Sequence, residues 1–291
     1  MEIYILAMFK NEGDILKEWI EHYKLFGINH IYLINDNSTD NGLEICNQYS
    51  DLVTVFNIDP NILDVKGRQV SAYNKHFNFL IGQPAWALVC DIDEFIFPVL
   101  STTFHEVLIT FNVNHITMPA YEFGFNSDEQ PSEIVNNCIL RRSNSLYIDK
   151  DGRYYMKSFV KLNSIKEFKS VHHQSLDKSI VICNSNIIRF NHYPLQSKIH
   201  IIKRLMRGGG DRYRLPMIKE SAENTYNNTD WSIYNKVEDT LLIETYKKMR
   251  NEQYKNIGLI ELYISLNVRP EKKDAATDII KPSIISSRKF T

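Results

Sequence analysis

Alternating strand and helix patterns in the first part of the chain restrict the fold more than any other feature of the sequence. Apolar runs with the length of buried strands occupy 2–9, 30–36, 52–58 and the start of 86–98. Apolar residues at helical spacing predict helices over 13–26, 42–49 and about 67–81. Strands that alternate with helices form parallel sheets covered on both faces, and such sheets bind ligands beyond the carboxyl ends of their strands. We therefore predict an α/β fold with a ligand site at those ends.

The second half of the chain is less regular and predicts mixed or antiparallel pairing. Its predicted strands cover 115–123 and the regions near 137–142, 155–162 and 180–190. Its predicted helices cover 103–111, 195–207, 231–250 and 256–267. A glycine run after residue 207 ends the second of these helices. We predict one α/β domain over 1–215 and a helical extension over 216–291, whose last part lacks a pattern and is expected to fray.

The composition is that of an ordinary globular protein. The 291 residues are 43% hydrophobic, and 34 Lys and Arg balance 35 Asp and Glu, which argues against a nucleic-acid partner. The four cysteines lie far apart without a CxxC pair, so they indicate neither a zinc framework nor a disulfide pattern and favour a reducing compartment. The first apolar run is too short for a signal peptide or a membrane span. We expect a cytoplasmic protein without a transmembrane segment.

The stretch WALVCDIDEFIFP, residues 86–98, places Asp91, Asp93 and Glu94 in an otherwise apolar run. Carboxylates are costly to bury, so these need water, a partner or a bound cation. Asp91 and Asp93 alternate along an extended backbone and point the same way, and two such oxygen donors can hold Mn²⁺ or Mg²⁺ while leaving positions for phosphate oxygens. A solvated loop is the alternative. Phosphatases of the haloacid dehalogenase type also carry two aspartates at this spacing, but usually near the start of the chain and with Thr or Val where Phe95 stands.

Polar residues also follow the first two strands. Backbone groups near Met8 and Phe9, with the side chains of Asn11 and Asp36, are placed to contact a nucleoside base and ribose. Helix capping by Asn11 and by residues 38–40 is the alternative interpretation, and both roles are compatible.

The helix before the fourth strand carries cationic and amide side chains that can contact a diphosphate: Lys66, Arg68, Gln69 and Asn74. A solvated helix face is the alternative interpretation. A neutral histidine, His192 or one of residues 172–173, can complete a metal site begun by Asp93, although a buried histidine is more often a core residue. Lys198 and Arg204 lie on a basic helix just after His192, where they can neutralise a departing diphosphate or simply face solvent.

Five stretches occur together in this order: KNEGDILKEWIEHYKLFGINHIYLINDNSTDN, WALVCDIDEFIFP, EFGFNSDEQP, VHH and NHYPLQSKIHIIKRLMRGGGDR. In order and spacing they resemble the family 92 glycosyltransferases and related family-2-like enzymes of GT-A fold, over about residues 1–215. The resemblance implies a Rossmann-like, mainly parallel sheet flanked by helices. It also implies a metal-dependent transferase that takes a sugar from a nucleotide diphosphate donor, a UDP-sugar first of all, usually with inversion.

The resemblance also assigns residues. It makes Asp91 and Asp93 the DxD acids, with Asp93 favoured over Asp91 as the direct metal ligand, and it matches the family's His-Tyr pair to His192 and Tyr193. On the nucleotide side it matches Lys10, Asn11, Glu12, Asp36 and Arg68. The family has a His-Tyr pair before Lys-Ser, whereas Ser197 and Lys198 stand here in the reverse order, which leaves the role of Lys198 open.

The acceptor side is less well defined. An inverting transfer needs a carboxylate to deprotonate the acceptor hydroxyl, and the candidates after the fourth strand are Glu122, Asp128, Glu129 and Asp211. We favour Asp128, although each of these acids can equally be a surface residue. The expected acceptor is a glycan or another glycoconjugate hydroxyl. The C-terminal helices are expected to bind acceptor, cover the site or form a homodimer, and a noncatalytic nucleotide-sugar-binding module is the third functional alternative.

Overall fold

The computed structural model describes residues 1–59, 61–62, 67–143, 155–171, 180–208 and 216–251. Lys66, residues 172–173, Asp211 and the predicted helix at 256–267 lie outside them. The strands are Glu2–Phe9 (β1), His30–Asn35 (β2), Val53–Asn57 (β3), Ala85–Val89 (β4), Glu94–Pro98 (β5), His115–Glu122 (β6), Leu140–Arg141 (β7), Met156–Lys161 (β8), Ile180–Ile182 (β9), Ile188–His192 (β10) and Val237–Glu238 (β11). The helices are Gly13–Leu25 (α1), Gly42–Asn47 (α2), Arg68–His76 (α3), Phe104–Leu108 (α4), Ile134–Asn137 (α5), Lys198–Arg207 (α6), Lys219–Asn227 (α7) and Leu241–Asn251 (α8). Short 3-10 turns lie at Asn78–Leu80 (η1), Leu162–Ser164 (η2) and Trp231–Tyr234 (η3).

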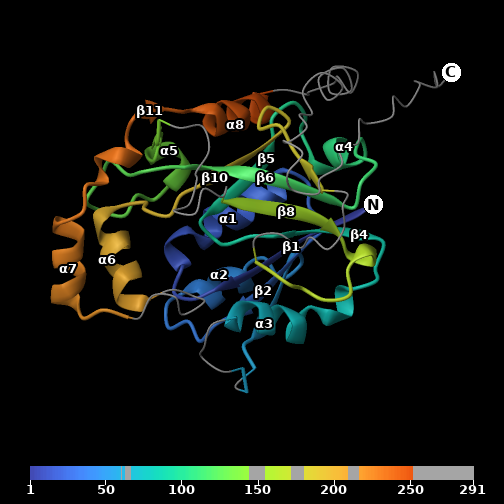
Figure 1. Ribbon diagram of the computed structural model, residues 1–291, viewed down its shortest axis with the longest axis horizontal. Helices are drawn as coiled ribbons and strands as arrows, with labels where there is room; N and C mark the ends of the chain where they lie inside the picture. Colours follow the sequence, from blue (N-terminus) through green and yellow to red (C-terminus); the bar gives the residue numbers. More distant parts are fainter. Residues whose placement is uncertain (60, 63–66, 144–154, 172–179, 209–215, 252–291) are drawn as a thin grey trace, which may run out of the picture.

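The described strands other than β7 and β11 form one nine-stranded sheet. Its order is β3-β2-β1-β4-β8-β6-β10-β5, with β9 also paired to β6. The first four strands are parallel, with Ile5 of β1 opposite Ile31 of β2 and Leu88 of β4. β8 then runs antiparallel between β4 and β6, and β5 lies antiparallel to β10 at the far edge. The predicted α/β class, with a mainly parallel central sheet flanked by helices, is confirmed (Figure 1).

Alternation along the strands divides the core between the two faces of the sheet. In β1, Ile5 and Ala7 pack with helix α1, whereas Leu6 and Met8 pack with α3 on the other face. This is the two-residue period of a strand that is buried on both sides. Helix α1 buries its apolar stripe, including Trp19, against the sheet because these residues recur at helical spacing.

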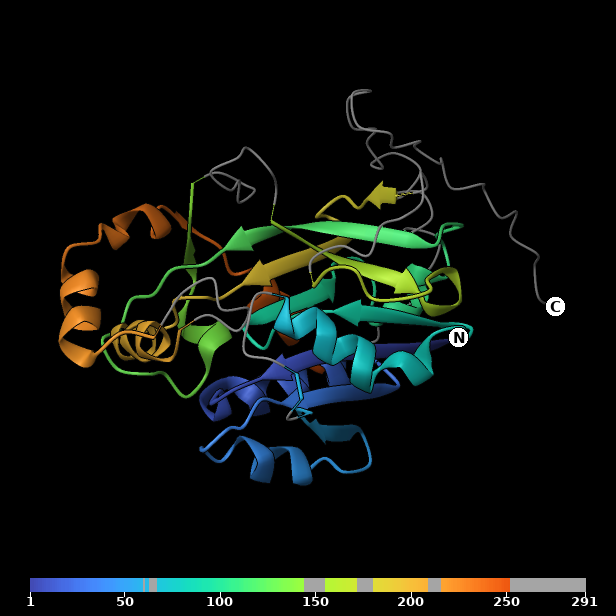
Figure 2. The same ribbon diagram turned by 60° about the horizontal axis from the view of Figure 1, so that its bottom comes forward.

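Helices α6 and α7 lie beyond one end of the sheet, opposite the end where the chain starts (Figures 1 and 2). The parallel strands β1, β2 and β4 finish at the end that faces α6. The basic helix is thereby brought to the strand ends where the sequence predicts a ligand site.

Several local predictions differ from the structure. The strand predicted at the start of 86–98 is β4, but Asp91 and Asp93 lie in the turn after it rather than on extended backbone, and Glu94 begins β5, which occupies a different place in the sheet. The helix predicted at 231–250 is divided into the turn η3, the strand β11 and the helix α8. The strand predicted at 180–190 is likewise two strands, β9 and β10. Helix α7 was not predicted, because its sequence KESAENTYN buries only Ala222 and has no apolar periodicity.

The C-terminal segment returns to the sheet domain. Strand β11 pairs with β7, and the hydroxyl of Tyr246 on α8 lies 2.7 Å from Nδ1 of His22 on α1. The division at residue 215 stays a prediction. Among the described residues, no helix combines the length and apolar character that crossing a bilayer requires.

Candidate active site

The turn between β4 and β5, residues 91–94, is called the acidic turn here and is held by helix α1. The indole Nε1 of Trp19 donates to the backbone oxygens of Asp91 and Glu94, both at 3.1 Å. The hydroxyl of Tyr23 also donates to the Glu94 oxygen, at 3.0 Å. The polar tips of two buried aromatic residues thus fix the backbone from which the acidic side chains project.

Asp91 is bound to side chains from two other elements. Its Oδ1 accepts from Nε2 of Gln69 on α3 at 3.0 Å, and its Oδ2 accepts from Nζ of Lys157 on β8 at 2.9 Å. The Lys157 side chain is completely buried. Burial alone would lower the pKa of Lys157, but Asp91 and Glu94 outweigh it and raise that pKa. Lys157 is therefore a charged internal partner of the acidic turn.

Glu94 is more buried than the two aspartates, and both of its carboxylate oxygens have partners. Its Oε2 accepts from the Asp91 backbone NH at 2.7 Å and lies 3.2 Å from Nζ of Lys157. Its Oε1 accepts from the Tyr155 hydroxyl at 2.9 Å. Burial raises the pKa of Glu94 to about 7, with Lys157 acting in the opposite direction.

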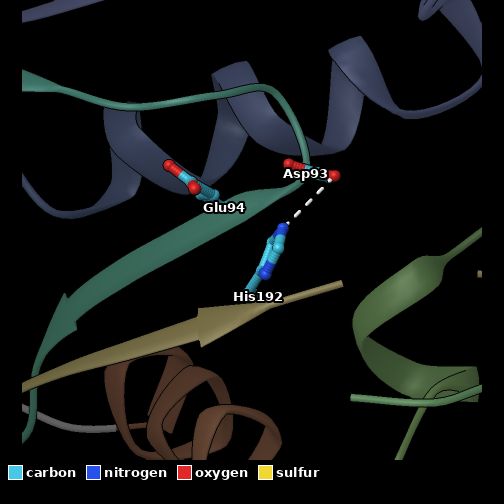
Figure 3. A group of neighbouring side chains, drawn as sticks. All are labelled: Asp93, Glu94 and His192. Atoms are coloured by element: carbon cyan, nitrogen blue, oxygen red, sulfur yellow. Dashed lines mark ion pairs between the residues drawn. The ribbon is translucent and has the colours of Figure 1, made fainter. Parts of the chain in front are cut away.

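Asp93 faces two basic side chains. Its Oδ2 lies 3.5 Å from Nε2 of His192, at the end of β10, and 3.5 Å from Nη1 of Arg204 on α6. Figure 3 shows Asp93 and His192 facing each other, with Glu94 extending to another side. Burial would raise the pKa of Asp93, but His192 and Arg204 outweigh it and hold that pKa well below its ordinary value. Asp93 in turn raises the pKa of His192 against the effect of burial.

A polar cavity of about 150 Å³ lies at these strand ends. It is lined by Met8, Phe9, Lys10, Glu12, Asp36, Gln69, Asp91, Asp93, Tyr155, His192, Arg204, Arg207 and Gly208. Ten of these thirteen residues are among those that the sequence predicts for the site. A second cavity, of about 430 Å³, is lined by Asn11 and shares Glu12, Arg204 and Arg207 with the first.

The predicted nucleotide side is partly structural. Asp36 lines the first cavity, but its Oδ1 accepts from Arg68 at 2.6 Å, and Arg68 is buried behind it. Asn11, at a positive φ of 52°, accepts from the Thr39 backbone NH at 2.7 Å and so joins the loops after β1 and β2. Asp40 caps both adjoining helices, because its oxygens accept from the NH groups of Gly13 and Gly42.

Gly13, at the start of α1, closely approaches side chains of the loop after β2. A Cβ at this position would lie 2.1 Å from Oδ1 of Asn41. The close approach of the two loops therefore excludes a larger side chain unless Asn41 moves.

Helix α6 supplies a second cation to the first cavity. Nη2 of Arg207 lies 3.0 Å from Oε1 of Glu12, and Nη1 donates to the Lys10 backbone oxygen. Burial raises the pKa of Glu12 to about 7, although Arg207 acts in the opposite direction. Lys198, by contrast, places its Nζ 5.2 Å from the ring centre of Tyr226 and does not line either cavity.

The base candidates are less close to the first cavity. Glu122 is buried and is paired with Arg142 at 3.2 Å, although it stands opposite His192 in the β6–β10 ladder. Asp128 and Glu129 are exposed on the loop between β6 and α5. None of these three lines either cavity, and Asp211 lies outside the described residues.

Tyr155 and Lys157 were not predicted for the site. Tyr155 lies directly before β8 and Lys157 near its start, and β8 pairs antiparallel with β4 and with β6. A lysine in the predicted strand near 155–162 was a usable signal, because a buried lysine requires a partner. Neighbouring Tyr155 also stacks on His192, with ring centres 4.9 Å apart.

The sequence matches the model of the family described as glycosyltransferase family 92 over residues 7–258. A search of curated proteins finds no match.

Two structures of S. aureus TarS 1-349 are similar to this chain. One is 13% identical, covers 67% of this chain and 61% of that chain, and has a TM-score of 0.38. The other, in complex with UDP, is 12% identical, covers 92% and 76%, and has a TM-score of 0.41. Glucosyl-3-phosphoglycerate synthase from Mycobacterium tuberculosis, in complex with Mn²⁺, UDP and glucosyl-3-phosphoglycerate, is 12% identical, covers 41% and 44%, and has a TM-score of 0.31. The chain thus spans less than two thirds of the first TarS structure and of the synthase.

Proposed function

The chain belongs to glycosyltransferase family 92, and on this premise we propose that it transfers a sugar from a UDP-sugar to a hydroxyl of a glycan or glycoconjugate. One observation places the proposed donor site in the cavity at the strand ends. Asp36, Asp93 and Arg204 come from three distant parts of the chain and line this one cavity. A nucleotide diphosphate donor requires acidic groups that contact its ribose or a metal ion, and a cation that contacts its phosphates.

The donor would lie along the ends of β1, β2 and β4. Backbone groups of Met8 and Phe9, together with Asp36, would contact the base and ribose. Arg204 and Arg207 would contact the diphosphate, because a guanidinium binds phosphate oxygens through paired NH groups. The chain's own contribution is thus to orient the donor and to offset the charge of the leaving group.

The residues present fit a divalent cation, Mn²⁺ or Mg²⁺. Ligand atoms of Asp93, Glu94 and His192 all lie within 4.8 Å of one another. Asp93 and His192 also line the cavity and would hold the cation, whereas Glu94 is engaged by Lys157 and Tyr155. Asp91 as a second ligand stays a prediction. When bound, a divalent cation supplies positive charge that stabilises the departing diphosphate.

The acceptor hydroxyl would be deprotonated by a carboxylate as the anomeric configuration inverts. Asp128 remains our first candidate for this base, ahead of Glu122 and Asp211. We also propose that residues 216–291 form a helical extension of the transferase domain over 1–215 and bind acceptor or a second copy of the chain. The cytoplasmic setting stays a prediction.

Donor turnover provides the direct test. Purified protein is incubated with a panel of nucleotide sugars and Mn²⁺, and separately with p-nitrophenyl phosphate. Release of UDP from one UDP-sugar, raised by a hydroxyl acceptor, supports the proposal. Release of p-nitrophenol instead would indicate a phosphatase, and UDP-sugar binding without release would indicate a noncatalytic module.

A further inference from the structure

The acidic turn is already faced by positive charge from the protein itself. Among the described residues, Lys157 and Arg204 are the lysine and arginine side chains that form ion pairs with its carboxylates. A divalent cation at Asp93 would add charge to a site that these two side chains partly neutralise. Like charges at one carboxylate repel, so the metal binds more favourably if one of these two side chains moves away.

Lys157 is not suited to move. Its side chain has no exposed surface, and its Nζ contacts Asp91 Oδ2 at 2.9 Å, Glu94 Oε2 at 3.2 Å and the Val171 backbone oxygen at 2.9 Å. The ammonium group donates hydrogen bonds to Asp91 and to Val171 and is paired with Glu94. Leaving this position would strand a buried cation and the buried carboxylate of Glu94.

Arg204 differs from Lys157 in each of these respects. Its side chain is 33% exposed, it lines the cavity, and its contact with Asp93 Oδ2 is long, at 3.5 Å. Its shorter contact is with the Pro194 backbone oxygen, at 2.7 Å. A guanidinium has five NH donors, so Arg204 can leave Asp93 and contact a phosphate while keeping this backbone bond.

We propose that Arg204 takes the place of the divalent cation at Asp93 when neither cation nor nucleotide is bound, and transfers to the donor diphosphate when the cation binds. The proposal rests on the proposed function, since it requires a nucleotide diphosphate at this cavity. Metal and nucleotide then bind cooperatively. The metal releases Arg204 from Asp93 to contact the diphosphate, and the diphosphate holds Arg204 away from the carboxylate that binds the metal. By linkage, UDP tightens Mn²⁺ binding by the same factor by which Mn²⁺ tightens UDP binding.

Replacement of Arg204 is expected to change two quantities in opposite directions: the affinity for Mn²⁺ alone, and the gain in that affinity when UDP is added. Arg204→Met removes the competing cation, so Mn²⁺ alone is expected to bind about tenfold more tightly than to the wild type, within the usual range of coupling between sites. The same variant loses the guanidinium that contacts the diphosphate, so the gain in Mn²⁺ affinity on adding UDP is expected to fall by a similar factor.

The test is a Mn²⁺ titration followed by electron paramagnetic resonance, which detects free Mn²⁺, with and without UDP. Lys203→Met is the matched control, because Lys203 is on the same helix but pairs with Asp14, at 3.0 Å, and is 62% exposed. Arg204→Gln, which keeps a donor for the Pro194 oxygen, serves if the methionine variant does not fold. Tighter Mn²⁺ binding in the Arg204 variant but not in the control, with reduced coupling to UDP, supports the proposal.

Two results would overturn it in different ways. If the wild type binds UDP and Mn²⁺ but the Arg204 variants show unchanged or weaker Mn²⁺ affinity without UDP, the exchange role of Arg204 is wrong and the proposed function stands. If the wild type binds no UDP with or without Mn²⁺, the donor site is wrong, and the proposed function and this role are both lost.

Discussion

Lys157 shows how a single residue can determine the charge state of the site without lining it. It is fully buried, and its ammonium group binds both Asp91 and Glu94. The sequence made the acids visible because they interrupt an apolar run, and it led to the prediction that they need a counter-charge. A protein partner was one of the predicted possibilities, beside water and a bound cation, but nothing local to residues 91–94 indicates that it is a lysine on a strand far along the chain.

Replacing Lys157 should destabilise the whole protein. Lys157→Met is expected to lower the free energy of unfolding by about 3–5 kcal/mol, because it leaves the buried carboxylate of Glu94 without its cation. Urea denaturation followed by circular dichroism measures this change. Adding Glu94→Gln should recover part of the loss, since the second substitution removes one of the unpaired charges. A loss below about 1 kcal/mol, typical of a surface ion pair, would contradict a buried role for Lys157.

At the scale of the element, helix α1 connects the site with the rest of the core. Trp19 and Tyr23 hold the acidic turn, while His22 binds the Ile96 backbone oxygen at 2.7 Å and Tyr246 at 2.7 Å. The helix and its apolar stripe were predictable because their periodicity is local. The hydrogen bonds that Trp19, His22 and Tyr23 make from that stripe were not predictable, because their partners come from β5, the acidic turn and α8.

His22 gives the protein a pH dependence with a defined sign. Burial lowers the pKa of His22 to about 3, from an ordinary value near 6.5. The unfolded chain therefore binds a proton that the folded protein does not, so stability falls as the pH drops below about 6.5. Between pH 7.5 and 5.5, the wild type should lose about 1 kcal/mol more than His22→Gln.

Urea denaturation at several pH values measures this difference. The raised pKa of Glu94 acts with the opposite sign between about pH 4.5 and 7, but it is common to both proteins and cancels in the comparison. Parallel stability curves for the wild type and His22→Gln would show that His22 is not held neutral.

At the scale of the whole molecule, the sheet combines a predictable half with an unpredictable one. The parallel pairing of β1 to β4 was predictable from the alternating strands and helices, which are joined by local crossovers. The insertion of β8 between β4 and β6 depends on pairing between distant segments, which no local pattern reveals. This insertion is what brings Tyr155 and Lys157 to the site.

The C-terminal segment is tied to this sheet by a buried charge cluster. Asp239 binds Arg141, with Nε at 2.6 Å, and also Arg189, whose guanidinium lies 3.5 Å from the ring centre of Tyr121. The sequence predicted helices here from periodicity, but this attachment joins three segments that lie far apart along the chain.

Asp239→Asn should loosen the attachment. It leaves two guanidinium groups without their shared carboxylate, and we expect a loss of about 3 kcal/mol in unfolding free energy. Hydrogen exchange should become faster in β11 and α8, with α1 less affected. Glu244→Gln, an exposed change on α8 itself, is the control. Equal exchange in the Asp239 variant and the control would show that the charge cluster does not hold this segment.

The central claim is that Asp93 holds a cation which in turn binds the diphosphate of the donor. Calorimetric titration of UDP in the presence of Mn²⁺, for the wild type and for Asp93→Ala, tests it most directly, with circular dichroism to show that both are folded. The account predicts that the variant loses Mn²⁺-dependent UDP affinity by at least about tenfold, as expected when a metal site is disrupted. Unchanged affinity in a folded Asp93→Ala protein would contradict the account.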